Sequence, residues 1–148
     1  MLYADTSIIV KLYIKEKHSL EVANWLRKNN EAIPLTRFHE LEFTNAIFLK
    51  QFRMEITDNQ LRLTLAKFSE HKTRGVYYYP QINWTDTLNL AIDLAHNNTA
   101  NTGSRSLDII HVASALALKA NRFLTLDDRQ SELASMAGLK VVNAINPY

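Results

Sequence analysis

Four acidic residues lie where apolar, strand-like runs give way to helix-like patterns: Asp5, Glu42, Asp108 and Asp127. In an α/β fold, the carboxyl ends of parallel strands meet the starts of the following helices at one edge of the sheet, and ligands bind there. Carboxylates that meet at such an edge repel one another unless a cation neutralises them. Because hard divalent cations prefer oxygen ligands, the four acids predict a site for Mg²⁺, with Mn²⁺ as the alternative.

Such an ion makes phosphodiester hydrolysis the leading chemistry. It can orient a phosphate ester, lower the pKa of an attacking water and stabilise the leaving oxygen. Taken singly, each Asp has a plainer role, because Asp is a common helix cap and a carboxylate in the first helical turn gains about 0.3–1 kcal/mol from the helix dipole. The set of four favours metal binding over coincidence. Whether one ion or two would bind stays open.

Glu40 and Glu42 compete for one position in this set. They are two residues apart, so on a helix their side chains diverge by about 200° and cannot both face a cleft easily. We select Glu42, for which the alternative role is that of a solvated surface glutamate.

Five further residues next to the acids can contact substrate or orient a ligand: Ser7, Arg105, His111, Thr125 and Asp128. Ser7 can hydrogen-bond a phosphate or simply begin a helix. His111 lies one turn after Asp108 on the same helix face, although packing is the commoner role for such a histidine. Arg105 can clamp a phosphate through two hydrogen bonds, and Thr125 has a structural role in a strand as its alternative.

The composition is that of one folded domain. The 148 residues are 47% hydrophobic with only 3 Gly and 3 Pro, so we expect a single domain over residues 1–148 without a linker. The absence of cysteine excludes disulfides and thiolate metal sites. A formal charge of +2 is too small to indicate nucleic-acid binding by bulk electrostatics. Neither a signal peptide nor a membrane span is visible, so we expect a cytoplasmic protein with no membrane partner.

Apolar runs alternate with helical patterns along the chain. Strand-like runs cover residues 2–4, 32–35, 122–126 and 139–142. The alternation predicts an α/β fold, a three-layer α/β/α sandwich with a central, mostly parallel sheet. Ser19 and Ser106 are expected helix caps, residues 57–60 have the form of a capping box, and residues 97–104 are the expected longest loop. Gly138 is expected to close the last helix in a left-handed cap.

Two further patterns, one mainly apolar and one aromatic, bear on the elements of this fold. A helix after the second strand is indicated by side chains that recur at helical spacing: Leu41, Asn45, Phe48, Leu49 and Phe52. The run from Tyr77 to Tyr79 fits either an edge strand or a docking surface.

Four motifs follow one another between residues 2 and 142. They are Asp5-Thr6-Ser7 after a short strand, Glu40-Leu41-Glu42 leading to Asn45-Ala46, Arg105-Ser106-Leu107-Asp108 with His111-Val112-Ala113, and Thr125-Leu126-Asp127 before Gly138. Together, and in this order, they resemble the PIN-domain ribonucleases and, more narrowly, the VapC-type toxins. Four spaced motifs are far more specific than any one of them alone.

The resemblance implies a PIN-like fold and a Mg²⁺-dependent endoribonuclease that cleaves RNA, the toxin of a type II toxin–antitoxin system. Such proteins are usually homodimers and are inhibited by a cognate antitoxin. By position, Asp5, Asp108 and Asp127 take the places of the family's metal ligands, and Glu42 that of its fourth acid. Asp128 doubles the last acid, so both members of that pair remain candidates.

Three other functions compete with this interpretation. A phosphotransferase with an aspartyl nucleophile would need an acid where Ser7 stands. A metal-free nuclease would need paired histidines as acid and base, whereas the 5 histidines here are scattered. The strongest rival is a non-catalytic PIN-like protein that binds RNA or a partner and uses its acids as helix caps, and the four intact acids argue against it.

Overall fold

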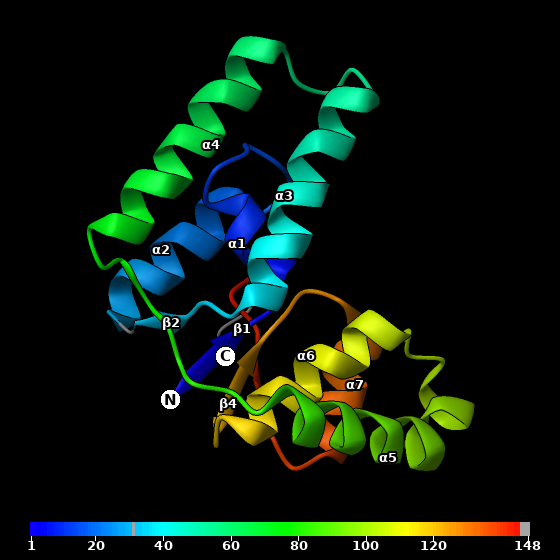
Figure 1. The fold of residues 1–148 in the computed structure, drawn as a ribbon. Coiled ribbons are helices and arrows are strands. Elements are labelled where there is room, and N and C mark those ends of the chain that lie inside the picture. Colours follow the sequence, from blue (N-terminus) through cyan, green and yellow to red (C-terminus); the bar gives the residue numbers. More distant parts are fainter. Residues whose placement is uncertain (31, 146–148) are drawn as a thin grey trace. The chain divides into compact units, whose positions relative to one another are not determined.

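The computed structural model describes residues 1–30 and 32–145, which form two compact units (Figure 1). The first unit joins Met1–Asp5 to the chain from Pro80 onward, and the second unit is Thr6–Tyr79. Each unit has its own parallel sheet. This division into two compact units does not test whether residues 1–148 form a single domain, so the single domain stays a prediction.

The first unit is built on a three-stranded parallel sheet. Its elements in chain order are β1 (Leu2–Ala4), α5 (Trp84–Thr102), α6 (Ser106–Ala117), β4 (Arg122–Leu124), α7 (Asp128–Met136) and β5 (Lys140–Val142). The strand order is β1-β4-β5, so α7 is the crossover between two neighbouring parallel strands, as a βαβ unit requires. The register places Tyr3 opposite Phe123 and Ala4 opposite Leu124.

The core of the first unit gathers buried side chains from β1, β4, α5, α6 and α7. Tyr3 and Phe123 stack there with ring centroids 5.6 Å apart and ring planes at 10°. Gly103 ends α5 in the left-handed conformation at φ 63°, which a residue with a Cβ adopts only with strain. This cap allows α6 to begin at Ser106 and pack beside α5.

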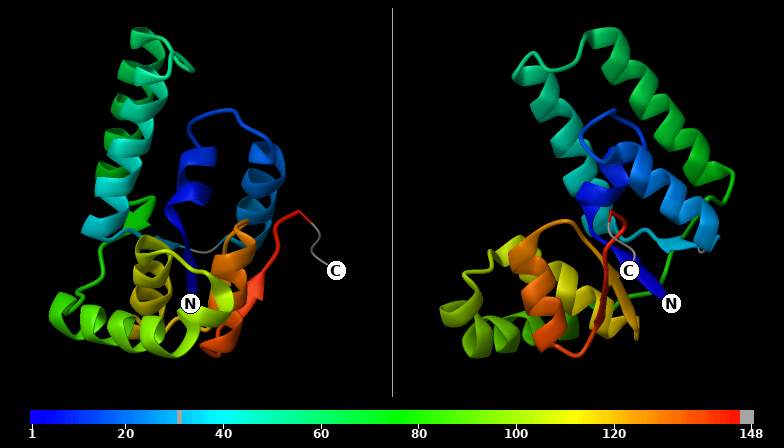
Figure 2. Two further views of the ribbon diagram at one scale, coloured as in Figure 1. Left: turned by 90° about the vertical axis from the view of Figure 1, so that its right-hand side faces the viewer. Right: turned by 180° about the vertical axis from the view of Figure 1, so that it is seen from behind.

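The second unit is mainly helical. Its elements are α1 (Thr6–Lys11), α2 (Ser19–Asn29), β2 (Ile33–Pro34), α3 (Arg37–Phe52), α4 (Asp58–Thr73) and β3 (Tyr77–Tyr78). The helices α3 and α4 form a hairpin that all the views show (Figures 1 and 2). Phe43 and Phe68 stack between them with centroids 4.0 Å apart, and Tyr13 meets both rings edge-on. An aromatic cluster therefore forms the centre of this unit.

The predicted α/β class and the parallel strand pairing are confirmed, but the sheet is divided. Among the described residues, β2 and β3 pair with each other and form a separate two-stranded sheet. Pro34 lies in β2 and has no backbone N–H, so this strand can donate few ladder hydrogen bonds. The expectation of one central sheet is therefore wrong for this chain, and residues Tyr77 and Tyr78 are a strand.

Two expected helix caps are wrong. The hydroxyl of Ser19 donates to the carbonyl of Ile14 at 3.1 Å and accepts the N–H of Glu16 at 2.9 Å, so it ties the preceding turn together instead of capping α2. The N-cap of α6 is Arg105 and not Ser106. By contrast, the capping box at residues 57–60 and the left-handed glycine after α7 are confirmed.

The loop expected at residues 97–104 is mostly helix, because α5 continues to Thr102. Its polar side chains bond back to helix carbonyls: the amide of Asn98 donates to Leu94 at 2.9 Å, and the hydroxyl of Thr102 donates to Asn98 at 3.1 Å. Such bonds let residues typical of loops stay in a helix.

The apolar pattern expected on the helix α3 lies on its exposed side. Leu41 and Phe52 are 67% and 82% exposed, whereas Phe43 and Ile47 are fully buried. This helix has two apolar faces, one with Leu41 and Phe52 and one with Phe43 and Ile47. The second face is buried because Phe43 packs in the aromatic cluster with Tyr13 and Phe68. None of the helices in the described part of the chain has the length and apolar character needed to cross a bilayer.

Candidate active site

The strand register places Asp5 beside Thr125. Because Ala4 lies opposite Leu124 in parallel strands, the residues that follow them are neighbours as well. The N–H of Asp5 donates to the carbonyl of Leu124 at 3.1 Å, which extends the ladder by one residue. The hydroxyl of Thr125 then donates to Oδ2 of Asp5 at 2.7 Å, and both side chains are buried. Parallel pairing thus places the Asp5 carboxylate and the Thr125 hydroxyl side by side at the C-terminal ends of β1 and β4.

Asp127 is joined to the same hydroxyl. Its backbone N–H donates to Oγ1 of Thr125 at 3.1 Å. Its carboxylate caps α7, since Oδ1 accepts the N–H of Gln130 at 2.9 Å, a position that the helix dipole favours for a negative charge. Asp127 and Asp128 are both exposed, and Asp128 is the first residue of α7. Of the two, Asp127 is the one joined to Thr125 by this hydrogen bond, and its selection as the acid of this group stays a prediction.

Asp108 stands in the first turn of α6, where its Oδ2 accepts the backbone N–H of Arg105 at 3.3 Å. Burial raises the pKa of the Asp108 carboxyl, and the negative charge of Asp127 raises it further. The Arg105 N–H and the charges of Arg105 and His111 act in the opposite direction without cancelling the rise in this pKa. The negative charge of Asp127 thus acts on the Asp108 carboxyl, in the direction that a neighbouring acid produces.

His111 is not exposed to solvent beside Asp108 but buried, with 3% of its surface accessible. Its Nδ1 lies 2.9 Å from the hydroxyl of Tyr3, which is fully buried in β1. Tyr3 was not among the residues predicted for the site. The available signal was its place two residues before Asp5 in a strand, because side chains at i and i+2 point to the same face of a sheet.

Glu42 and Ser7 belong to the second unit. The hydroxyl of Thr6 donates to Oε2 of Glu42 at 2.6 Å, so a residue next to Asp5 in sequence holds the fourth predicted acid. Ser7 is an exposed residue of the first turn of α1. Glu40, the competitor of Glu42, accepts from Lys72 at 2.9 Å and from Arg37 at 2.8 Å and is thus engaged in ion pairs. That Glu42 and Ser7 join the site stays a prediction.

Asp5, Asp108 and Asp127 come from three distant segments of the first unit, and that they share one site stays a prediction. Hydrogen bonds through Thr125 link Asp5 to Asp127, and electrostatic repulsion links Asp127 to Asp108. Within residues 1–30 and 32–145, no group of three or more His, Asp or Glu side chains is arranged so that it could hold a metal ion. Mg²⁺ commonly keeps several waters and takes only one or two protein carboxylates. Carboxylate oxygens are the donor type that Mg²⁺ prefers, and that Asp5, Asp108 and Asp127 hold such an ion stays a prediction.

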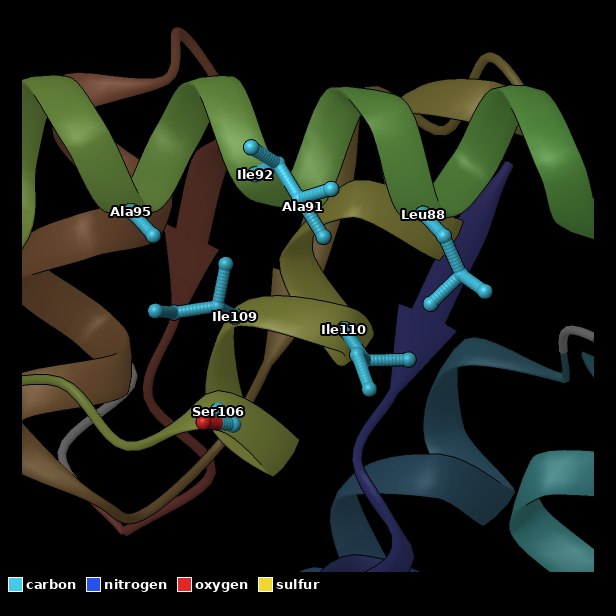
Figure 3. Close-up of a pocket in the computed structure, with 7 residues that line it drawn as sticks. All are labelled: Leu88, Ala91, Ile92, Ala95, Ser106, Ile109 and Ile110. Carbon is cyan, nitrogen blue, oxygen red and sulfur yellow. The ribbon is translucent and has the colours of Figure 1, made fainter.

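An apolar pocket of about 310 Å³ opens between α5 and α6 (Figure 3). Leu88 and Ile92 from α5 and Ile109 and Ile110 from α6 line it, with Ser106 as its polar member. The described residues that line this pocket are apolar apart from Ser106, so the pocket lacks the carboxylates predicted for the site.

Solved structures share this fold, although no family model and no curated protein matches the sequence. FitAcB from Neisseria gonorrhoeae superposes with a TM-score of 0.71 and 15% identity over 99% of both chains. VapBC2 from Rickettsia felis, bound to a DNA fragment from their promoter, gives a TM-score of 0.63 and 16% identity over 97% of this chain and 98% of that one. PAE2754 from Pyrobaculum aerophilum gives 0.55 and 13% identity over 95% and 87%. At these identities the likeness shows the α/β fold alone.

Proposed function

We propose that the chain is a Mg²⁺-dependent endoribonuclease of the PIN-domain type and the toxin of a type II toxin–antitoxin pair. The observation that supports this proposal most is the pair of hydrogen bonds that join Thr125 to the carboxylate of Asp5 and to the backbone of Asp127 at the carboxyl edge of the sheet, beside the influence of the Asp127 charge on the pKa of Asp108. The four ordered motifs resemble those of VapC-type toxins. The likeness of fold to FitAcB and VapBC2 supports the same assignment.

Each acid has a definite role in this mechanism. Asp5, Asp108 and Asp127 hold the ion, and Glu42 is the fourth acid. Thr125 holds one carboxylate oxygen of Asp5 at 2.7 Å and so orients that ligand before the ion arrives. When bound, Mg²⁺ supplies charge stabilisation for the phosphate and a lower pKa for the attacking water. Burial is the main cause of the raised pKa of Asp108 and the charge of Asp127 a smaller one, and a bound cation would favour the ionised carboxylate against both.

The substrate and partners follow from the same proposal. RNA is the substrate, and the exposed Arg105 at the start of α6 provides a cation beside Asp108 for a phosphate. Ser7 and Asp128 are proposed to contact the substrate or a bound water, and the buried His111 is proposed to act on Asp108. A cognate antitoxin inhibits the protein, which acts as a homodimer in the cytoplasm. Mn²⁺ is expected to replace Mg²⁺.

An RNA cleavage assay tests the enzymatic part. Purified protein is incubated with end-labelled RNA in Mg²⁺, in Mn²⁺ and in EDTA, and cleavage is expected only with a metal ion. Asp5→Asn and Asp108→Asn should abolish cleavage while circular dichroism stays unchanged. The matched control is Asp93→Asn, the same change on the exposed side of α5, which should remain active. An active Asp108→Asn protein would contradict the assignment of the site.

Metal titration separates the enzyme from a non-catalytic binding protein. A ligand that binds only the native state raises the melting temperature. Mn²⁺ should therefore raise the melting temperature of the wild type but not that of Asp5→Asn. A melting temperature indifferent to metal in both proteins would favour the binding protein, whose acids serve only as caps.

A growth assay tests the toxin part. Induced expression should arrest growth of the host cells, and co-expression of a small protein encoded next to this one should relieve the arrest. Expression of the Asp108→Asn variant is the control and should be harmless. Normal growth with an active nuclease would separate the nuclease from the toxin role.

A further inference from the structure

A buried tyrosine–histidine pair connects β1 to α6. The hydroxyl of Tyr3 and Nδ1 of His111 lie 2.9 Å apart although 108 positions separate the two residues in sequence. Tyr3 has no accessible surface and His111 has 3%. The rings meet edge-on, with centroids 5.8 Å apart and planes at 65°. Away from water, such a bond is strong and directional, and leaving one partner unsatisfied is costly.

Each member of this pair lies near a proposed metal ligand in the same strand or helix. Tyr3 and Asp5 are two residues apart on a strand whose ladder continues through the N–H of Asp5, so their side chains share a face of the sheet. His111 and Asp108 are three residues apart on α6 and share a face of that helix. The electrostatic influence of His111 on Asp108 agrees with this proximity.

The ring of Tyr3 is also held from its other side. It stacks almost parallel on Phe123, its partner in the register of β1 and β4, with centroids 5.6 Å apart. Tyr3 can therefore shift relative to β4 only if the stacking is lost. The hydrogen bond between Tyr3 and His111 then fixes α6 relative to β1.

We propose that Tyr3 and His111 are positioning residues that set the spacing between Asp5 and Asp108. The inference rests on the proposed nuclease function, since this spacing matters only where both carboxylates serve one ion. Neither residue touches substrate or metal in this role. Both act through the acids: Tyr3 on Asp5 along β1, and His111 on Asp108 along α6.

The chain contains a matched control for this pair. In the second unit, the hydroxyl of Tyr13 lies 2.8 Å from Nδ1 of His71, the same atoms as in the first pair. It also lies 2.8 Å from the hydroxyl of Tyr77. Residues 6–79 contain none of the three acids proposed to hold the ion. Loss of the Tyr13 hydroxyl removes both of these bonds, so it shows what the loss of a tyrosine–histidine bond together with a neighbouring hydroxyl contact does to stability, away from the three proposed ligands.

The experiment measures Mn²⁺ affinity without any cleavage step. The apparent Kd for Mn²⁺ is obtained by electron paramagnetic resonance of the free ion with the full chain as wild type, Tyr3→Phe, Tyr13→Phe and His111→Asn. Loss of a group bonded directly to a metal ligand typically weakens binding by about 10- to 100-fold. Tyr3 acts on its ligand at one remove, so Tyr3→Phe should weaken Mn²⁺ binding by about tenfold, the low end of that range. Tyr13→Phe should lower the melting temperature yet keep the affinity of the wild type.

His111→Asn is the conservative variant, because its amide oxygen can accept from Tyr3 near the place of Nδ1. It should bind Mn²⁺ more tightly than His111→Leu, which has no acceptor. The same two His111 variants decide the matter if Tyr3→Phe does not fold. Equal Mn²⁺ affinity in wild type and Tyr3→Phe, or in the two His111 variants, would overturn the positioning role and leave the nuclease assignment intact. A wild type that binds no Mn²⁺ would instead overturn the proposed function on which the inference rests.

Discussion

Thr125 donates its hydroxyl proton to Oδ2 of Asp5 across a distance of 2.7 Å, although 120 positions separate the two residues in sequence. The same oxygen of Thr125 accepts the N–H of Asp127 at 3.1 Å. One buried hydroxyl thus joins the end of β1 to the start of α7. Its removal should affect both acids at once.

Thr125→Val is expected to destabilise the protein by about 1–3 kcal/mol, because a buried carboxylate loses a donor and a backbone N–H loses its acceptor. Equilibrium urea denaturation measures the loss as a change in the free energy of unfolding. Thr125→Ser is the control, since it keeps the hydroxyl and should retain most of the stability. Equal stability of the Val and Ser variants would show that these hydrogen bonds contribute little.

Asp127 serves as cap and proposed ligand, and two substitutions separate these roles. Asp127→Ala should lower the free energy of unfolding by about 1 kcal/mol, because the N–H of Gln130 loses its acceptor. Asp127→Asn should keep this stability, since Asn is an equally good N-cap. Only the negative charge is lost, so the Asn variant should show a smaller rise of the melting temperature with Mn²⁺. An Asn variant with the full metal response would remove Asp127 from the ligand set.

The raised pKa of Asp108 predicts a stability that depends on pH. Its native carboxyl binds a proton more tightly than the unfolded one does, so the ionised group destabilises the native state. This penalty begins as the pH rises through the unfolded value, about 3.9, and is complete above the native pKa. Asp108→Asn should therefore melt at a higher temperature than the wild type at pH 7 without metal. The difference should vanish as the pH falls below about 4.

Glu40 should show the opposite dependence on pH. Burial acts to raise its pKa, but hydrogen bonds from Lys72 and Arg37 outweigh burial and hold the pKa below its ordinary value. A lowered pKa stabilises the native state above the unfolded value of about 4.3, and this contribution is lost as the pH falls through the native pKa. Melting curves of Glu40→Gln and wild type should differ at pH 7 and converge in acid. Parallel curves at all pH values would contradict this.

The sequence predicted most elements whose ends depend on local residues. The capping box at Thr57 and the glycine after α7 act through hydrogen bonds within a few residues, so their patterns were sufficient. The cap at Ser19 was mispredicted because its hydroxyl donates to the carbonyl of Ile14 in the preceding turn. The loop at residues 97–104 was mispredicted because the side chains of Asn98 and Thr102 donate to carbonyls of the same helix. The buried face of α3 depended on an aromatic cluster assembled from three segments.

The candidate site divides in the same way. Asp108 and Asp127 could be placed at helix starts from the sequence, since each belongs to a local capping pattern. The bonds from Thr125 to Asp5 and from Tyr3 to His111 could not, because they join residues more than 100 positions apart. Such contacts depend on which strands are neighbours and in which register, and no local pattern carries that information.

The register of β1 has a consequence for insertions and deletions. Side chains alternate across a strand, so one residue inserted between Tyr3 and Asp5 would turn one of these side chains to the opposite face of the sheet. The aromatic stack on Phe123 and the bond to Thr125 could then no longer form together. Length variation should therefore be far less tolerated in these first five residues than in the turn between α3 and α4.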